Sequence, residues 1–506
     1  MFDLIIEGFS LVLNFHTMLL ILGGTLLGLM FGLIPGLSAT MAVAICLPIT
    51  YGMGPVEGFA LLIGLYIGGS SGGFIPSVLL NLPGTPSSVA TTFDGYPMAQ
   101  KGLAGRAFGI SIITSFWAGL ISIIVLVLVA EPLAKFALNF GPFEFFAVAL
   151  LALTLISSLS EGSLLKALIA ALLGLTFAFV GSAPIDAYPR FTFGMNELSA
   201  GFNMLPVLIG IFAISEMLKI IENKNKISTP GSQLNIDQAK IKGLGWPLKD
   251  FWKQKWNFIR STIIGLGIGI LPGIGGGTAN LVAYGTAKKQ SKYPEKFGTG
   301  IDDGVVASEA SNNATIGGDM VPLISLGIPG DTVTAMLLGG LMLHGLQPGP
   351  LLIEQNGPIV YSIYAALFIA NIFMVILLYL GMRGFVKMLS IEKYYLYPII
   401  IALCVVGAFG VNNRLFDAFA LLGFGILGYL MVKTKFPLVP LILGFILGPL
   451  LETNLRRGLQ LSDGSFMPFV TEPISGLFLL ATVLSIVFSV IKERKSRMNK
   501  SANIAG

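Results

Sequence analysis

The chain has 506 residues, of which 54% are hydrophobic and 11% charged, and its formal net charge is +5. Soluble domains carry roughly 25% charged residues, so this composition excludes an ordinary soluble enzyme or binding domain. Five long stretches contain no Asp, Glu, Lys or Arg: 8–56, 58–93, 107–130, 261–287 and 355–382. Because a helix needs roughly 20 apolar residues to cross a bilayer, we expect an all-α polytopic membrane protein with about 10–12 transmembrane helices.

The first half of the chain is predicted to form one repeat and its following spans, within residues 1–221. Residues 1–15 are expected to lie at the membrane interface, and they lack the basic region of a cleavable signal. Residues 68–92 are rich in Gly, Ser, Thr and Pro but carry no charge. That combination favours a re-entrant hairpin buried among helices. Expected spans and short apolar pieces are 17–34, 37–50, 57–70, 107–130, 142–158, 163–181 and 201–221.

A polar linker, residues 222–257, separates the halves; it is rich in Lys and has three Trp residues suited to an interface. The second repeat and the C-terminal spans are expected within 258–491, followed by a basic tail at 492–506. A second hairpin is predicted at about 320–343. The other predicted spans and helices are 258–272, a helix to 287, 301–318, 356–380, 394–411, 415–432, 436–451 and 473–491.

Each half breaks its helices twice at a Pro-Gly pair. The pairs begin at Pro35 and Pro83 in the first half and at Pro272 and Pro329 in the second, 48 and 57 residues apart. Broken helices at matching places in two halves are typical of a transporter's binding site. The loops after the breaks alternate in Lys and Arg content, so the positive-inside rule predicts inverted-topology repeats. The same rule places the linker and the C-terminal tail in the cytoplasm.

The breaks offer hydroxyls, an amide and free backbone N–H groups, but no Lys or Arg. A half-helix that begins at a break points its positive dipole end at a cavity and favours an anion. Small polar residues also serve packing and capping, and Asp331 after a Pro-Gly pair suits an N-cap. The candidate substrate-binding residues are Ser38, Thr40, Asn81, Gly84, Thr85, Ser87, Ser88, Gly330, Asp331, Thr332 and Thr334.

Four polar residues in residues 308–319 are candidate ligands for a coupling Na⁺: Asn312, Asn313, Glu309 and Asp319. Amides and carboxylates inside a membrane are costly and functional by default. Interhelical hydrogen bonding is the alternative for the two Asn residues. Proton coupling through Glu309 or Asp319 is the alternative for the carboxylates.

No nucleophile–base pair, metal cluster or phosphate-binding loop is found, so we expect neither an enzyme nor a protein with a cofactor other than the coupling ion. Cys46 and Cys404 lie in apolar runs and are expected to be inert packing residues without a disulfide. His344 at the end of the second hairpin is expected to be an interfacial residue rather than a ligand.

At these motifs the chain resembles the large membrane subunit of the tripartite tricarboxylate transporters, TctA-like proteins. The resemblance covers about residues 15–490. It is carried by 32–40, Asn81-Leu82-Pro83-Gly84 with Pro86-Ser87-Ser88, 94–99, 291–298, Glu309, Asn312-Asn313, 326–330, Gly345 with 348–350, Gly444, 447–449, Glu452 and Arg456-Arg457.

The resemblance implies a prokaryotic cytoplasmic (inner) membrane, import of tri- or dicarboxylates, and a cation gradient as the driving force. It implies two partners: a small TctB-like membrane subunit and a TctC-like extracytoplasmic solute-binding protein. A homo-oligomer is a further possibility. Asp331 and Ala287 depart from the family pattern, where a small neutral residue and a Glu are expected, which argues against citrate itself. Proton-coupled uptake of another small solute, a channel, and a non-transporting scaffold or sensor subunit are the alternatives.

Overall fold

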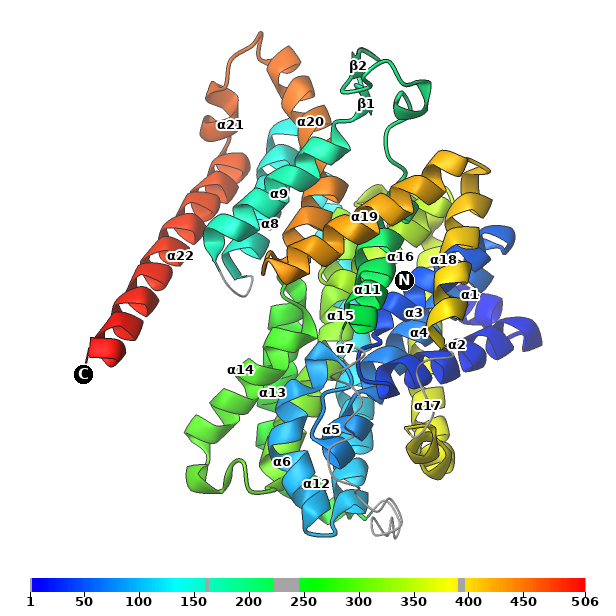
Figure 1. Cartoon of the computed structure of the whole chain (residues 1–506), viewed down its shortest axis with the longest axis vertical. Coiled ribbons are helices and arrows are strands. Elements are labelled where there is room, and N and C mark those ends of the chain that lie inside the picture. The colour runs from blue at the N-terminus through cyan, green and yellow to red at the C-terminus, as the bar shows by residue number, and fades with distance from the viewer. Residues whose placement is uncertain (1, 160–162, 223–244, 390–395, 506) are drawn as a thin grey trace. The chain divides into compact units, whose positions relative to one another are not determined.

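The computed structural model describes residues 2–159, 163–222, 245–389 and 396–505, and these are almost entirely helical (Figure 1). In this part of the chain, eight helices are long and apolar enough to cross a membrane. Five shorter apolar helices, of 10–17 residues, accompany them. The prediction of an all-α polytopic membrane protein is therefore confirmed.

The chain divides into two compact units, and each draws on both halves of the sequence. Unit 1 holds residues up to 134, 216–270 and 274–411, and unit 2 holds 135–215, 271–273 and the residues from 412 onward. All candidate site residues lie in unit 1. The predicted boundary at the 222–257 linker divides the sequence into two halves. It does not separate the two compact units, because each unit combines segments from before and after the linker.

The helices of unit 1 are α1 (Phe2–Val12), α2 (Phe15–Leu33), α3 (Ala39–Cys46), α4 (Pro55–Gly72), α5 (Phe74–Leu80), α6 (Val89–Gln100), most of α7 (Ala104–Ala137), most of α11 (Ser215–Glu222), α12 (Leu248–Lys253), α13 (Lys255–Ile270), α14 (Gly275–Gln290), α15 (Asp302–Leu326), α16 (Thr332–Leu343), α17 (Leu351–Met388) and α18 (Leu396–Asn412). Short 3-10 turns are η1 (Leu47–Gly52), η2 (Pro86–Ser88) and η6 (Pro294–Lys296).

The first predicted break of each half, at Pro35 and at Pro272, lies between two helices. Gly36, between α2 and α3, has a φ of 95°, and Gly273, between α13 and α14, has a φ of 76°. Such left-handed backbone is costly for residues with a Cβ, which explains glycine at these turns. The first hairpin turns at residues 81–88, late in the predicted range of 68–92, because α4 and α5 form an apolar helical stretch from Pro55 to Leu80. The second hairpin, predicted at about 320–343, turns at residues 327–331. Small residues such as Gly68 pack α4 closely on α2.

Two helix pairs, α2 with α4 and α13 with α15, pack through glycines in the same way. A Cβ on Gly64 would lie 2.6 Å from the Ile21 carbonyl oxygen, and a Cβ on Gly269 would lie 2.8 Å from that of Thr315. Small residues let membrane helices approach this closely. The parallel between the two pairs supports the predicted repeat, in which α2–α6 correspond to α13–α16.

Unit 2 contains α8 (Pro142–Leu159), α9 (Leu164–Ala178), β1 (Gly181–Ser182), β2 (Pro189–Arg190), η3 (Asn196–Leu198), α10 (Met204–Ile209), the π-helical turn η4 (Gly210–Ile214), α19 (Leu415–Lys433), α20 (Leu438–Leu461), α21 (Met467–Thr471) and α22 (Pro473–Ala505). The antiparallel strands pair Gly181 with Arg190. Arg190 forms a two-pronged ion pair with Glu452 on α20, at 2.5 and 3.0 Å. This pair fixes the loop between α9 and α10, which the sequence analysis did not anticipate.

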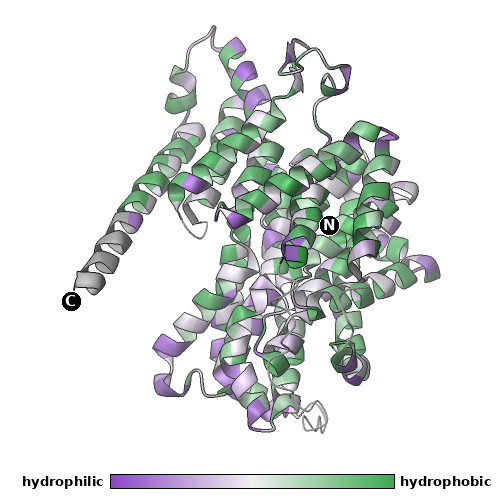
Figure 2. Cartoon of the chain, viewed as in Figure 1, coloured by the Kyte–Doolittle hydropathy of each residue, from purple (hydrophilic) through white to green (hydrophobic). Residues whose placement is uncertain are grey.

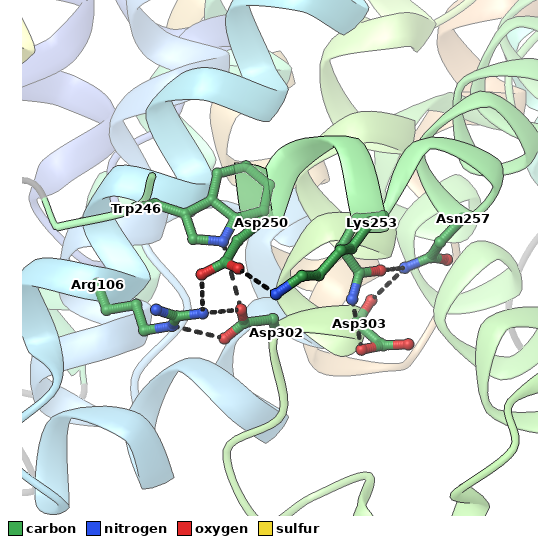
Figure 3. Close-up of polar contacts among 8 residues, drawn as sticks. Arg106, Trp246, Asp250, Lys253, Asn257, Asp302 and Asp303 are labelled. Carbon is green, nitrogen blue, oxygen red and sulfur yellow. Dashed lines mark hydrogen bonds and ion pairs between the residues drawn. The ribbon is translucent and has the colours of Figure 1, made fainter. Parts of the chain in front are cut away.

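The described end of the predicted cytoplasmic linker, from residue 245, lies in a polar region of unit 1, and Figure 2 shows hydrophilic residues at the ends of α12 and α14. Arg106, at the start of α7, binds Asp302 at 2.5 Å and Asp250 at 3.0 Å (Figure 3). The Lys253 ammonium and the Arg106 guanidinium hold the pKa of the Asp250 carboxyl below its usual value. Trp246 donates its indole N–H to Asp302 at 3.3 Å. The start of α7, the described end of the linker and the start of α15 therefore share one polar network.

Candidate functional site

The first hairpin turns at residues 81–88, between α5 and α6. Asn81 ends α5 in a left-handed conformation with a φ of 55° and is exposed. The Ser88 hydroxyl donates to the Thr85 carbonyl at 2.9 Å and accepts the Thr85 N–H at 3.2 Å, which completes a capping box. Ser88 is thus buried and occupied by the turn itself, whereas Ser87 is half-buried. The Ser87 hydroxyl shares a hydrogen bond of 3.2 Å with the Thr85 hydroxyl, and of the two serines Ser87 is the less buried.

The second hairpin turns at residues 327–331, between α15 and α16. Gly327 ends α15 with a φ of 71°. Asp331 is the N-cap of α16: its carboxylate accepts the Thr334 N–H at 2.7 Å and the Thr334 hydroxyl at 2.6 Å. Thr334 is fully buried by this cap, whereas Asp331 and Thr332 are half-buried. The capping role anticipated for Asp331 is therefore present.

The second hairpin meets the first break. The Thr40 and Thr332 hydroxyls share a hydrogen bond of 2.7 Å, although 292 residues separate them. Ser38 is the N-cap of α3 and accepts the Met41 N–H at 3.2 Å. The N-termini of α3 and α16 therefore lie together, and we call this place the acidic junction because Asp331 belongs to it.

The first hairpin meets the second break in the corresponding way. The Asn280 amide of α14 donates to the Ser87 carbonyl, and a Cβ on Gly276 would lie 2.9 Å from the Ser87 Cβ. The N-termini of α14 and of the η2–α6 segment therefore lie together, and we call this place the uncharged junction. The first turn of α14 begins with three glycines, 275–277, which supply backbone N–H groups but no side chains of their own. Ser87 and Asn312 lie beside Gly276, and a Cβ on Gly275 would lie 3.2 Å from the Asp331 Cβ, so the two junctions adjoin at Asp331.

Helices α4 and α15 run antiparallel between the two junctions. The Tyr66 hydroxyl donates to Asp319 at 3.2 Å, and the Ser71 hydroxyl donates to the Asn313 side-chain oxygen at 2.8 Å. Residue numbers therefore rise along α4 as they fall along α15. These are the matching helices of the two predicted repeats, so their opposite directions support inverted topology.

All four candidate cation ligands form hydrogen bonds between helices, and Asn313 and Glu309 use all of their side-chain oxygens in such bonds. Asn312 donates to the Ser70 carbonyl at 3.1 Å, and Asn313 donates to the Ser115 hydroxyl at 2.7 Å. Glu309 accepts the Thr91 hydroxyl at 2.5 Å and the Ser115 hydroxyl at 3.2 Å. These contacts tie α15 to α4, α6 and α7, the alternative role considered for the amides.

Asp319, the fourth candidate, is different. It is fully buried, and its Oδ1 atom has no hydrogen-bond partner among the described residues. It interacts electrostatically with Asp331, and a Cβ on Gly330 would lie 2.5 Å from the Asp319 Cα. Asp319 therefore lies directly beneath the second hairpin turn. In the described ranges no group of three or more His, Cys, Asp or Glu side chains is placed to hold a metal ion.

Asp94 of α6 organises the loop before α15, a role that the sequence motif did not reveal. Its buried carboxylate accepts the Gly298, Gly300 and Ile301 N–H groups at 2.8–3.0 Å and the Tyr284 hydroxyl at 2.8 Å. Ala287 lies in an apolar cluster with Tyr284 and Phe297. The first hairpin is thus anchored to both α14 and α15.

The two junctions bring together residues that the sequence analysis singled out in separate motifs. Thr40, Asp331, Thr332 and Asp319 lie at the acidic junction, and Ser87 lies at the uncharged one. Thr85, Ser88 and Thr334 support the turns, while buried Gly84 and Gly330 allow close backbone approach. Tyr66 and Asn280 were not anticipated, because only their long-range contacts distinguish them.

Paired broken helices in an all-helical membrane protein indicate a transporter, and the comparisons decide the family. The model of the tripartite tricarboxylate transporter TctA family matches residues 18–443. The chain belongs to this family. It is a multi-pass membrane subunit of a transporter family, and the tripartite system implies TctB and TctC partners.

Two relatives come from Agrobacterium vitis. The "Uncharacterized 52.8 kDa protein in TAR-I ttuC' 3'region" is 37% identical over 477 residues, 94% of each chain. The "Uncharacterized protein in TAR-II ttuC' 3'region" is 38% identical over 231 residues, which is 45% of this chain and 96% of the relative. No solved structure matches the chain.

Proposed function

We propose that this TctA-family chain is the permease subunit of a binding-protein-dependent secondary transporter that imports tri- or dicarboxylates or related organic anions. It acts in a prokaryotic cytoplasmic membrane with a TctB-like small subunit and a TctC-like extracytoplasmic solute-binding protein. A cation gradient, with Na⁺ favoured over H⁺, drives alternating access around the two hairpins. The observation that carries the proposal is the crossed pairing of each hairpin turn with the break of the other half.

The uncharged junction suits the substrate carboxylate. A carboxylate that leaves water loses several kcal/mol of solvation unless other donors replace the water. Two helix N-termini meet there, each worth roughly 0.3–2 kcal/mol to an anion. Each hydrogen bond to a charged group adds roughly 1.5–3 kcal/mol, and the glycines of α14 and the half-buried Ser87 hydroxyl supply such donors. Several donors together offset the desolvation without a Lys or Arg.

The acidic junction is less suited to the anion, because the Asp331 carboxylate already occupies the N-terminus of α16. A second carboxylate placed there meets like-charge repulsion. We therefore assign the substrate to the donors around Gly276 and Ser87. The coupling ion is assigned to the region of Asp319 and Asp331, where it also offsets the Asp331 charge that lies beside Gly275.

Uptake of labelled citrate, malate and succinate by a heterologous host tests the proposed function. The host lacks its own carboxylate uptake and expresses this chain with its small subunit and its binding protein. We expect accumulation of at least one of these anions only when all three proteins are present. Accumulation without the binding protein, or of none of the carboxylates, would contradict the proposal.

A further inference from the structure

We infer that Asp319 and Asp331 bind one Na⁺ between them, and that this ion fastens the second hairpin turn to α15. The inference rests on the proposed cation-coupled function and assigns the ion to two of its residues. It differs from a site built on Asn313 or Glu309, whose side-chain oxygens all accept hydrogen bonds from neighbouring helices.

The first observation is the incomplete bonding of Asp319. Its Oδ2 accepts only the Tyr66 hydroxyl, at 3.2 Å, and its Oδ1 has no partner among the described residues although the side chain is fully buried. A buried, incompletely paired carboxylate is expensive unless a cation or a proton compensates it. Glu309 on the same helix shows the contrast, because both of its oxygens accept hydroxyl hydrogen bonds.

The second observation is the nearby anion. Asp331 interacts electrostatically with both Asp319 and Tyr66. Asp319 is fully buried and Asp331 is half-buried, so the two carboxylates repel each other, and a monovalent cation between them removes that repulsion. The Asp331 carboxylate accepts both Thr334 contacts through Oδ1 and also bonds to the Val333 N–H and the Tyr66 hydroxyl, so Tyr66 contacts both carboxylates.

The third observation is a local supply of carbonyl oxygen. Pro322 lies inside α15 and has no N–H to give to the carbonyl four residues earlier, that of Gly318. This carbonyl therefore lacks its helical partner next to Asp319. Carboxylate and carbonyl oxygens are the ligands that hard cations prefer.

The position of these groups gives the ion a mechanical consequence. Asp319 belongs to α15, whereas Asp331 begins α16 across the hairpin turn, and Gly330 touches the Asp319 backbone. An ion held by both carboxylates fixes the turn in the arrangement seen here. Without the ion, repulsion between the carboxylates favours separation of the turn from α15. Ion binding thereby controls the half of the site that contains Thr332 and Thr40.

Thermal unfolding of the purified full-length protein tests the inference, with NaCl titrated against choline chloride at constant ionic strength and no substrate. We expect Na⁺ to raise the melting temperature of the wild type. In Asp319→Asn the Na⁺ concentration at half-maximal effect should rise at least tenfold. In Glu309→Gln, which removes a buried carboxylate from the same helix, it should stay within about twofold. If Asp319→Asn does not fold, Asp331→Asn carries the same expectation.

An unchanged Na⁺ midpoint in folded Asp319→Asn or Asp331→Asn would overturn the assignment, as would a loss of the Na⁺ response in Glu309→Gln alone. Absence of any Na⁺ effect on the wild type would also overturn it. In each of these cases carboxylate uptake by the three-protein system still reports on the proposed function separately, because a proton-coupled importer would retain it.

Discussion

Gly267 and Gly269 of α13 differ in what an added methyl group would meet. This difference gives a strict test of how α13 packs on α15 beneath the acidic junction. A Cβ on Gly269 would lie 2.8 Å from the Thr315 carbonyl oxygen and 3.0 Å from the Asp319 nitrogen. A Cβ on Gly267, two residues earlier, meets nothing within 4 Å. The variants Gly269→Ala and Gly267→Ala therefore share their chemistry and helix but not their surroundings.

The magnitude follows from the required displacement. Ordinary contact begins at 3.4 Å, so α13 and α15 must separate by 3.4 − 2.8 = 0.6 Å to admit the methyl group. Overpacking of this kind costs roughly 1–3 kcal/mol. Replacing Gly by Ala within a helix gains up to about 1 kcal/mol, but this gain is common to both variants and cancels in their difference. We expect Gly269→Ala to be about 1–3 kcal/mol less stable than Gly267→Ala.

Thermal unfolding in one detergent, with and without Na⁺, measures this difference. Gly269→Ala should melt several degrees below Gly267→Ala, and its Na⁺ stabilisation should be weaker because the displaced backbone belongs to Asp319. Gly267→Ala should equal or exceed the wild type. Equal melting temperatures for the two variants would refute the close packing of α13 on α15.

Three further predictions address other parts of the molecule. Ser88→Ala should lower the melting temperature, because it leaves the buried Thr85 N–H without its hydrogen-bond acceptor at a cost of roughly 1–3 kcal/mol. Ser87→Ala should weaken carboxylate affinity with little effect on the melting temperature. The reverse pattern would exchange the roles of the two serines. Arg190→Ala should expose the loop between α9 and α10 to limited proteolysis, since it removes the two-pronged partner of a buried carboxylate, and unchanged cleavage would show that this ion pair does not hold the loop. Cysteine placed at Asn225, outside the described residues, should react with impermeant reagent only from the cytoplasm, and at Asn196 only from outside; the opposite labelling would invert the assigned topology.

Composition and local motifs were sufficient to predict the helical membrane class and the breaks. The Pro-Gly pair at Pro35 predicts a turn, because the backbone preferences of Pro and Gly are properties of the residues themselves. The composition of residues 68–92 predicts a buried hairpin, but it does not predict that helix continues past Gly68 and Ser71 to Leu80 before the chain turns. Small residues suit both a turn and a helix that packs closely on its neighbours, and only the neighbours decide between the two.

The site itself required contacts that sequence spacing does not contain. Tyr66 and Asp319 are 253 residues apart, and Arg190 and Glu452 are 262 apart. Nothing local to either residue identifies its partner. Likewise, Ser87 and Ser88 have the same chemistry, and only the structure shows that Ser88 is buried in the capping box whereas Ser87 is half-buried.

Gradient-driven uptake into sealed proteoliposomes tests the central claim most directly. The vesicles contain this chain and its small subunit, and the binding protein loaded with labelled citrate or malate is added outside. With Na⁺ outside and choline inside, we predict that the labelled anion accumulates above its external free concentration. The accumulation should collapse when a Na⁺ ionophore dissipates the gradient, and Ser87→Ala should reduce its rate. Uptake that stops at equal concentrations on both sides would identify a channel and contradict the account.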